Sequence, residues 1–161
     1  MALEIERRFR VASDAWRAGV VRSTRIIQGY LAITEASVTR VRVRETNAYL
    51  TIKSRDGGLA RQEFEYAIPL ADAQSLLKLC GARVLEKVRH EMDHGGYRWE
   101  IDEYLAPFEG LILAEVEMQS ESENPPLPPW IGEDVTFDPS LSNAALAQRV
   151  EALHRARGMP C

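Results

Sequence analysis

Cysteine is scarce in this sequence, which has only Cys80 and Cys161 among its 161 residues. Cys80 lies in an apolar stretch and Cys161 is the last residue, so the two thiols cannot build a disulfide framework, and a reducing compartment suits them. The sequence also lacks a run of about 18 apolar residues and an apolar signal core near its N-terminus. These absences predict a cytoplasmic protein that makes no contact with a membrane.

An excess of charge of one sign is absent as well. Lys and Arg number 20 and Asp and Glu number 24, which gives a formal net charge of −4. This balance provides no broad basic field for nucleic acid or for an anionic membrane. Hydrophobic residues make up 45% and charged residues 27%, which excludes a disordered chain or a collagen-like repeat. The length corresponds to one domain, which we expect to span residues 1–161.

Most of the chain alternates between apolar and polar residues with period two, which is typical of β-strands. Asp56-Gly57-Gly58 and His94-Gly95-Gly96 lie between adjacent segments, where glycine supplies the positive φ of a hairpin turn. The sequence therefore predicts an α+β fold, mostly β, in which eight antiparallel strands close into a barrel. The predicted strands are Leu3–Val11, Gln28–Ile33, Val38–Glu45, Tyr49–Ser54, Arg61–Ile68, Arg83–Met92, Tyr97–Tyr104 and Ile112–Met118.

Helical spacing is confined to three short flanking segments: Ser13–Trp16, Ala71–Cys80 before Gly81, and a final helix that Ser142 or Asn143 can cap. We expect these helices to cover part of the apolar outer face of the barrel.

The polar phase of the predicted strands consists almost entirely of ionised side chains. Some strands carry only cations, such as Arg40, Arg42 and Arg44, and others carry only carboxylates, such as Glu115 and Glu117. For any single strand, the simplest interpretation is a solvated outer face. Solvent-facing positions are usually mixed with Ser and Thr, however, so the joint pattern of seven strands favours charges that point into the barrel.

An interior with this many charges has to be wet, because desolvating each ion costs several kcal/mol unless it is paired or coordinated. Arginine forks bind phosphate oxygens, and carboxylates hold hard divalent ions such as Mg²⁺ or Mn²⁺. Carboxylates two positions apart on a strand point the same way, about 6–7 Å apart. Two such pairs facing each other could share one or two ions. The pattern thus predicts a tunnel that binds a polyanion together with divalent cations.

The segment Glu4-Ile5-Glu6-Arg7-Arg8 resembles the ExExK signature of the triphosphate tunnel metalloenzymes, also called the CYTH superfamily. ExExK alone is a weak motif, but an ordered set of matches to the small bacterial inorganic triphosphatase members covers nearly the whole chain. The further matching segments are Gln28–Leu31, Val41–Arg44, Leu50–Lys53, Arg61–Glu65, Glu86–Arg89, Trp99–Asp102, Glu115–Glu117 and Pro129–Thr136.

The resemblance implies an eight-stranded tunnel that binds a triphosphate with Mg²⁺ or Mn²⁺. It implies metal binding by Glu4, Glu6 and Glu117, with Glu115 and Asp102 near the metal or supporting it. The phosphate-binding residues it implies are Arg8, Arg42, Arg44, Lys53, Lys87 and Arg89, with Glu63 and Glu65 as orienting or metal-supporting groups in the tunnel. We expect Glu4, Glu6, Arg8 and Tyr30 to be catalytic, and Tyr30 either touches the substrate or packs the barrel.

Arg8 stands where the signature has lysine. Arginine keeps the charge but cannot give up a proton near neutral pH, so we expect an electrostatic role and no proton transfer at this position. Arg40 also has inward parity, and a position at the tunnel mouth is left open for it.

The segment His90-Glu91-Met92-Asp93-His94 is a literal H-E-x-x-H match. Zinc binding by this motif needs a helix. Here the segment continues a predicted strand, on which four residues span about 13 Å, too far for both imidazoles to reach one zinc ion. We expect no zinc site, and His90 should face outward.

The predicted activity is metal-dependent hydrolysis of inorganic tripolyphosphate to pyrophosphate and phosphate, because the small chain leaves little material for an organic-moiety pocket. A class IV-type adenylate cyclase, a thiamine triphosphatase and a non-catalytic polyphosphate-binding module remain open. The last of these would explain the arginines but not the paired glutamates, which repel an anion unless a metal intervenes. An outward apolar strand face would suit a homodimer.

Overall fold

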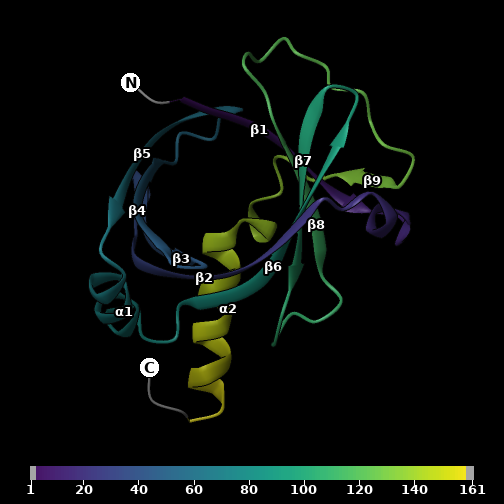
Figure 1. Ribbon diagram of the computed structural model, residues 1–161. Helices are drawn as coiled ribbons and strands as arrows, with labels where there is room; N and C mark the ends of the chain where they lie inside the picture. Colours follow the sequence, from purple (N-terminus) through teal and green to yellow (C-terminus); the bar gives the residue numbers. More distant parts are fainter. Residues whose placement is uncertain (1–2, 159–161) are drawn as a thin grey trace.

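A ring of antiparallel strands dominates the computed structural model, which describes residues 3–158 and therefore leaves Cys161 outside the described residues (Figure 1). The predicted α+β fold, mostly β, with a closed eight-stranded barrel is confirmed. In ring order the strands are β1 (Leu3–Val11), β5 (Ala60–Ile68), β4 (Asn47–Ser54), β3 (Ser37–Arg44), β2 (Arg22–Ile33), β6 (Val84–His94), β7 (Tyr97–Tyr104) and β8 (Ile112–Glu117), and β8 pairs with β1 again.

Strand β1 closes the ring, and it also carries a ninth strand that we did not predict. Its first residues, Leu3–Ile5, pair with β5, and Glu6–Arg10 pair with β8. Strand β9 (Ile131–Asp134) pairs with Phe9 and Val11 on the edge that β8 leaves free. Four residues are too few to show a period-two pattern, so no strand is predicted there.

Two of the predicted helical segments cover apolar outer faces, as expected. Helix α1 (Leu70–Leu79) packs over β2, β3 and β4 and ends before Gly81, which has a φ of 59°. Gly29 on β2 permits this close packing, because a Cβ there would come within 2.7 Å of the Cys80 sulfur. The 3₁₀ helix η1 (Ala15–Gly19) buries Trp16 in an outer cluster with Trp99 and Trp130.

The C-terminal helix departs from the expectation that all three helices cover the outer face. Helix α2 (Asn143–Ala156), preceded by the 3₁₀ turn η2 (Pro139–Leu141), packs against side chains that point into the barrel. Leu146, Ala147 and Val150 share a cluster with the inward residues Tyr30 and Leu85. In Figure 1 this helix (yellow) enters the ring of strands. It therefore brings its N-terminal turn to the interior of the barrel.

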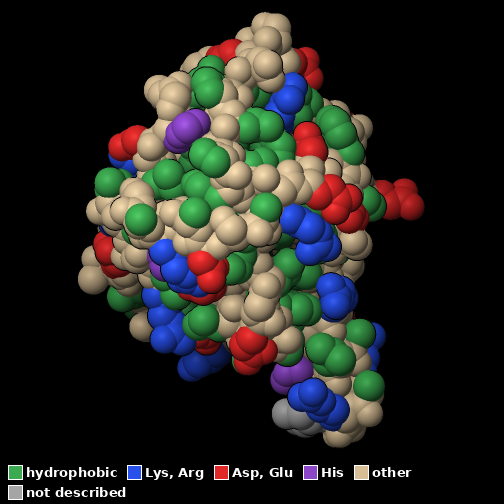
Figure 2. All heavy atoms as spheres, turned by 90° about the vertical axis from the view of Figure 1, so that its right-hand side faces the viewer, with side chains coloured by type: hydrophobic (Ala, Val, Ile, Leu, Met, Phe, Trp, Pro, Cys, Tyr) green, Lys and Arg blue, Asp and Glu red, His purple; other side chains and the backbone are tan. Residues whose placement is uncertain are grey.

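The outer surface on the side of β7 to β9 carries acidic and basic side chains interspersed with apolar ones (Figure 2). This mixture agrees with the small net charge of −4. Within residues 3–158, no helix is long and apolar enough to cross a membrane.

Candidate active site

The inward side chains of the barrel and the first turn of α2 line a cavity of about 240 Å³. Most of the site residues predicted from the sequence meet there. The predicted residues in the lining are Glu4, Glu6, Arg8, Tyr30, Arg42, Lys53, Glu63, Glu65, Arg89, Glu115 and Glu117. The predicted residues Arg44, Lys87 and Asp102 are not among the residues that line it.

Strand register explains why carboxylates gather at one place in this cavity. Across the β1–β8 ladder, Glu6 lies opposite Glu117 and Arg8 lies opposite Glu115. Across the β7–β8 ladder, Glu100 lies opposite Glu115. Directly opposite residues have Cβ atoms only about 4.5–5.5 Å apart. Three adjacent strands therefore place four carboxylates on the same part of the wall.

The carboxylates in this group differ in how well they are neutralised. Burial raises the pKa of Glu6 to about 8, together with the nearby charges of Glu115 and Glu4. Burial and the same kind of repulsion raise the pKa of Glu117. Burial also acts on Glu4, but Lys53 Nζ at 2.8 Å and Arg61 Nη2 at 3.3 Å outweigh it and lower the pKa of Glu4 to about 2. The cations next to the cluster therefore do not neutralise all of its negative charge.

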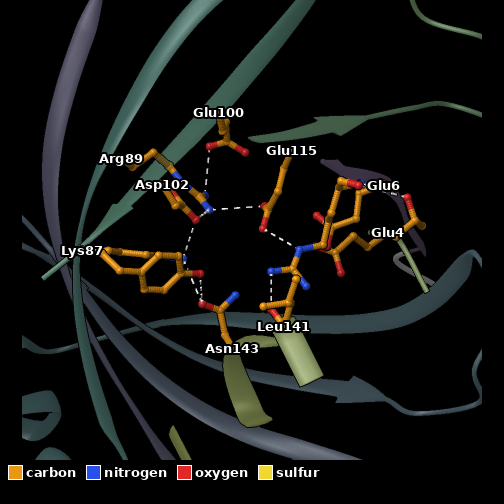
Figure 3. A network of polar contacts seen from close by, with 12 residues as sticks. Glu4, Glu6, Lys87, Arg89, Glu100, Asp102, Glu115, Leu141 and Asn143 are labelled. Carbon is orange, nitrogen blue, oxygen red and sulfur yellow. Dashed lines mark hydrogen bonds and ion pairs between the residues drawn. The ribbon is translucent and has the colours of Figure 1, made fainter. Parts of the chain in front are cut away.

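A second feature is a dry ion-pair network on β6 and β7 (Figure 3). Lys87 Nζ donates to Asp102 Oδ2 at 2.6 Å, and Arg89 Nε donates to Asp102 Oδ1 at 2.7 Å. Arg89 Nη2 also donates to Asp102 Oδ2 at 2.8 Å. Burial alone would raise the pKa of Asp102, but Arg89 and Lys87 hold it well below its ordinary value.

The network shows where two of the predicted site residues lie. Asp102 and Lys87 have 0% exposed side chains and are not among the residues that line the cavity, and both oxygens of Asp102 contact cations. The predicted roles of Asp102 in metal binding and of Lys87 in phosphate binding remain predictions. The β6–β7 register puts Arg89 directly opposite Asp102. Arg89 does line the cavity, where it also contacts Glu100 at 2.9 Å and Glu115 at 3.4 Å.

On the β3 side of the cavity, the arginines are paired with carboxylates less closely than Arg89 is. Arg42 donates to the side-chain oxygen of Gln28 at 2.9 and 3.1 Å. Arg40 is 5% exposed, donates to Thr51 at 3.3 Å and lies 3.8 Å from Glu65. Its Nε has no hydrogen-bond partner in the described part of the chain. Burial, Arg40 and Arg89 lower the pKa of Arg42 to about 10, so this wall holds excess positive charge.

Arg8 links the carboxylate cluster to the C-terminal segment. Its Nε lies 3.3 Å from Glu115 Oε1, and its Nη2 donates to the carbonyl of Leu141 at 2.7 Å (Figure 3). Both contacts use the guanidinium fork, which a lysine at this position does not have. Arg8 is therefore held at the cavity and also fixes the turn that precedes α2.

Arg44 and the H-E-x-x-H segment lie outside the cavity. Arg44 pairs with Glu91 at 2.9 Å. His90 is on strand β6, 3.1 Å from Glu103, and its ring packs on that of Trp16 in the outer cluster. It faces outward, as predicted, and the segment is a strand and not the helix that a zinc motif requires.

Eight residues of the lining were left out of the predicted site, and five of them carry a charge or an amide. Arg61 and Glu100 share the parity of predicted neighbours on their strands, so the alternation did contain their signal. Arg40 has the inward parity that the sequence indicated, and its side chain is buried in the wall. Asn143 carried no signal beyond helix capping, and Arg55 lies beyond the end of β4. The five residues with a charge or an amide are Arg40, Arg55, Arg61, Glu100 and Asn143.

The donor set of the cavity suits a hard divalent cation, since its acidic ligands are all carboxylate oxygens. Within residues 3–158, no three His, Cys, Asp or Glu side chains are already gathered as a metal site. Burial raises the pKa values of Glu6 and Glu117, and so do neighbouring carboxylates, Glu115 and Glu4 for Glu6, and Glu4, Glu100 and Glu63 for Glu117. A divalent ion would relieve the repulsion among these carboxylates, so the residues present fit a metal.

A second cavity of about 290 Å³ adjoins the first, and the two share Glu6, Arg8 and Arg61 in their lining. The β4–β5 turn and the segment after β9 form its outer part, with Leu59 and Phe137 among the apolar residues. From the sequence we expect little material for an organic-moiety pocket, but the structure does have a second cavity beside the tunnel.

Comparisons with known proteins agree with this geometry. The family model of the CYTH domain matches residues 2–148. The inorganic triphosphatase of Acetivibrio thermocellus is 38% identical over 149 residues, which cover 92% of this chain and 95% of the relative. The inorganic triphosphatase of Nitrosomonas europaea is 36% identical over 148 residues, covering 89% and 96%. A crystal structure of an inorganic triphosphatase matches with a TM-score of 0.66 and 34% identity, covering 91% of this chain and 95% of that one.

Proposed function

This chain belongs to the CYTH domain family, and on that premise we propose that it hydrolyses inorganic tripolyphosphate to pyrophosphate and phosphate with the help of a divalent metal. One observation carries the proposal. A single cavity holds the guanidinium groups of Arg40, whose nearest carboxylate is Glu65 at 3.8 Å, and of Arg42, which donates to neutral Gln28, and it also holds a cluster of carboxylates around Glu6. A polyanion neutralises the first group and a divalent cation neutralises the second.

The cations of the wall bind and orient the phosphate chain. Arginine forks can donate two parallel hydrogen bonds to phosphate oxygens, which fixes the orientation as well as the charge. Arg8, Arg42, Lys53 and Arg89 line the cavity and take this role, together with Arg40. Lys87 acts indirectly, because it donates to Asp102, which in turn accepts from Arg89.

Glu6, Glu115 and Glu117 would hold the metal, with Glu4, Glu63 and Glu65 nearby in the lining. When bound, Mg²⁺ or Mn²⁺ neutralises phosphate charge and favours in-line displacement at phosphorus. Glu63 also contacts Lys53 at 3.1 Å, which keeps that ammonium at the cavity.

The reaction consumes one water molecule. The water oxygen bonds to a terminal phosphorus, the bridging P–O bond breaks, and pyrophosphate leaves with the bridging oxygen. The proton lost by the water passes to a tunnel carboxylate or to solvent. Arg8 remains protonated throughout, so it stabilises charge without transferring a proton. Tyr30 lines the cavity, with its hydroxyl 3.3 Å from Gln28 Nε2, and it contacts the substrate from the Arg42 side.

The decisive experiment measures phosphate release from tripolyphosphate with Mg²⁺, with Mn²⁺ and with a chelator. Glu6→Gln removes a carboxylate from the cluster, and Glu121→Gln is the matched control on an exposed loop. We expect metal-dependent release by the wild type and the control, and a loss of about 10²-fold or more in Glu6→Gln. Absence of release with either metal contradicts the proposal.

The same assay separates the alternatives. ATP and thiamine triphosphate test whether the adjoining cavity at Leu59 and Phe137 accepts an organic group, and we expect slower turnover than with tripolyphosphate. A polyphosphate-binding module would bind tripolyphosphate without releasing phosphate.

Several expectations from the sequence remain predictions: one domain over residues 1–161, a cytoplasmic location, no nucleic-acid or membrane partner, and a homodimer. The outward side chains of Phe64 and Tyr66 on β5 are 39% and 56% exposed and offer an apolar face of the kind that a homodimer would use.

A further inference from the structure

The first turn of α2 is held firmly against the cavity. Ser142, Asn143 and Ala144 all belong to the lining. Ser142 Oγ caps the helix by accepting from the Ala145 N–H at 3.1 Å. Arg8 donates to the Leu141 carbonyl at 2.7 Å, one residue before the cap. The position of Asn143 in the tunnel is therefore fixed from both sides.

The hydrogen bonds of Asn143 determine which way its amide points. Tyr104 Oη donates to Asn143 Oδ1 at 2.7 Å, and Lys87 Nζ lies 3.4 Å from the same oxygen. A lysine ammonium has donors only, so the atom facing it has to be the amide oxygen. The amide nitrogen of Asn143 then points away from Lys87, toward the space ringed by the network in Figure 3. Among residues 3–158 this nitrogen has no hydrogen-bond partner.

The same cavity is lined by arginines that are not fully neutralised. Arg40 is 5% exposed, and its Nε has no partner among the described residues. Arg42 is held by the Gln28 amide and by no close carboxylate. The N-terminus of the 14-residue helix α2 adds the positive end of its dipole. A group that satisfies these donors must bring several oxygen acceptors and negative charge.

We propose that Asn143 is a substrate-binding residue, which donates its Nδ2–H to an oxygen of the terminal phosphate at the α2 end of the tunnel. The proposal rests on the proposed function, because it takes tripolyphosphate as the anion. Tyr104 and Lys87 position the amide, and Arg40 binds the same phosphate. The substrate then lies with one end against α2 and the remaining phosphates toward the carboxylate cluster.

Asn143→Asp is the sharpest test, because a carboxylate keeps both contacts, to Tyr104 and to Lys87, while it loses the donor and places negative charge beside the phosphate. Gln148→Glu makes the same chemical change on the exposed face of α2 and is the matched control. Steady-state kinetics with tripolyphosphate and metal give KM and kcat, and thermal unfolding reports on the fold.

We expect Asn143→Asp to raise KM about 10- to 100-fold, with a much smaller change in kcat and a melting temperature no lower than that of the wild type. Asn143→Ala, which removes the donor without adding charge, should raise KM about tenfold. Gln148→Glu should stay within about twofold of the wild type, since its side chain lies on the surface. Equal KM values in Asn143→Asp and Gln148→Glu overturn the proposal.

The two proposals fail in different ways. A wild type that hydrolyses no tripolyphosphate contradicts the proposed function and leaves Asn143 to be judged by calorimetric titration with tripolyphosphate. In that titration, weaker binding by Asn143→Asp than by Gln148→Glu supports the role of Asn143, and equal binding contradicts it.

Discussion

Two walls of the same tunnel carry buried arginines, and their partners differ. On β6 and β7, Arg89 and Lys87 are neutralised by Asp102 at 2.6–2.8 Å, with Glu100 and Glu115 adding to Arg89. On β3, Arg40 and Arg42 donate to the neutral side chains of Thr51 and Gln28, and the nearest carboxylate to Arg40 is Glu65 at 3.8 Å. The first wall is complete without a ligand, whereas the second is not.

The difference separates residues that build the tunnel from residues that bind in it. Asp102 is buried and fully engaged, so its charge serves the stability of the barrel and the position of Arg89. Arg42 is partly buried and forms no ion pair among the described residues, and desolvation together with Arg40 and Arg89 lowers its pKa to about 10. An anion in the cavity would offset this excess of positive charge. Substitutions in the two walls should therefore affect different measurements.

The largest effect is expected for Asp102→Asn. Removing one partner of a buried ion pair leaves uncompensated charge, so the free energy of unfolding should fall by about 3–5 kcal/mol. Asp93→Asn is the matched control, because Asp93 pairs with Arg98 on the surface with a 61% exposed side chain, and it should cost less than about 1 kcal/mol. Chemical denaturation of both variants measures the comparison. A loss in Asp102→Asn no larger than in the control would mean that this wall does not depend on its ion pairs.

Arg42→Gln should show the opposite behaviour. We expect kcat/KM for tripolyphosphate to fall about 10²- to 10³-fold, because a preorganised charged donor is lost. The free energy of unfolding should stay the same or rise, since the removed cation is partly buried, lies near Arg40 and Arg89 and forms no ion pair among residues 3–158. Kinetics and denaturation on the same preparation test both statements. A variant that unfolds more easily and retains its activity would reverse the assignment of the two walls.

The pH dependence of stability sharpens the comparison at the first wall. The pKa of Asp102 is depressed in the folded state, so its contribution to stability is present above its ordinary value of 3.8 and is lost as the pH falls below it. The difference in unfolding free energy between wild type and Asp102→Asn should therefore shrink below that pH, by at most about 1.4 kcal/mol per pH unit. Denaturation curves at several acidic pH values measure it. A difference that grows as the pH falls contradicts the depressed pKa.

The smallest effect is expected for Arg44→Gln. Arg44 pairs with Glu91 away from the cavity, and Arg22 and Arg98 lie within 3.8 Å of the same carboxylate. We expect a change of less than about 1 kcal/mol in stability and about twofold in kcat/KM. A loss of activity comparable to that of Arg42→Gln would return Arg44 to the substrate-binding set implied by the family resemblance.

Much of this arrangement could be predicted from the sequence, because strand parity follows from period two. The bounds of β1 and β7 agree with the predicted strands, and Glu6, Arg42 and Glu115 point inward as the alternation indicated. The alternation does not show, however, whether an inward side chain reaches the cavity or is buried behind its wall. Asp102 has the same parity as Glu100, yet the β6–β7 register puts it opposite Arg89 and behind the wall.

Residues outside the strands were harder to predict. Asn143 begins a helix whose sequence shows an amphipathic pattern but not the surface that it covers. Its place in the tunnel depends on Leu146, Ala147 and Val150 packing on inward residues of strands far away in the chain. Strand β9 is similar, since its four residues pair with Phe9 and Val11 of β1, which lie far away in the chain.

A crystal structure with tripolyphosphate and Mn²⁺, using the anomalous signal of the metal, tests the division of the tunnel most directly. We expect phosphates bound to Arg40 and Arg42 and metal bound at Glu6 and Glu117. The contacts of Asp102 with Lys87 and Arg89 should be unchanged. Metal bound to Asp102, or a phosphate that displaces Asp102 from Arg89, would contradict it.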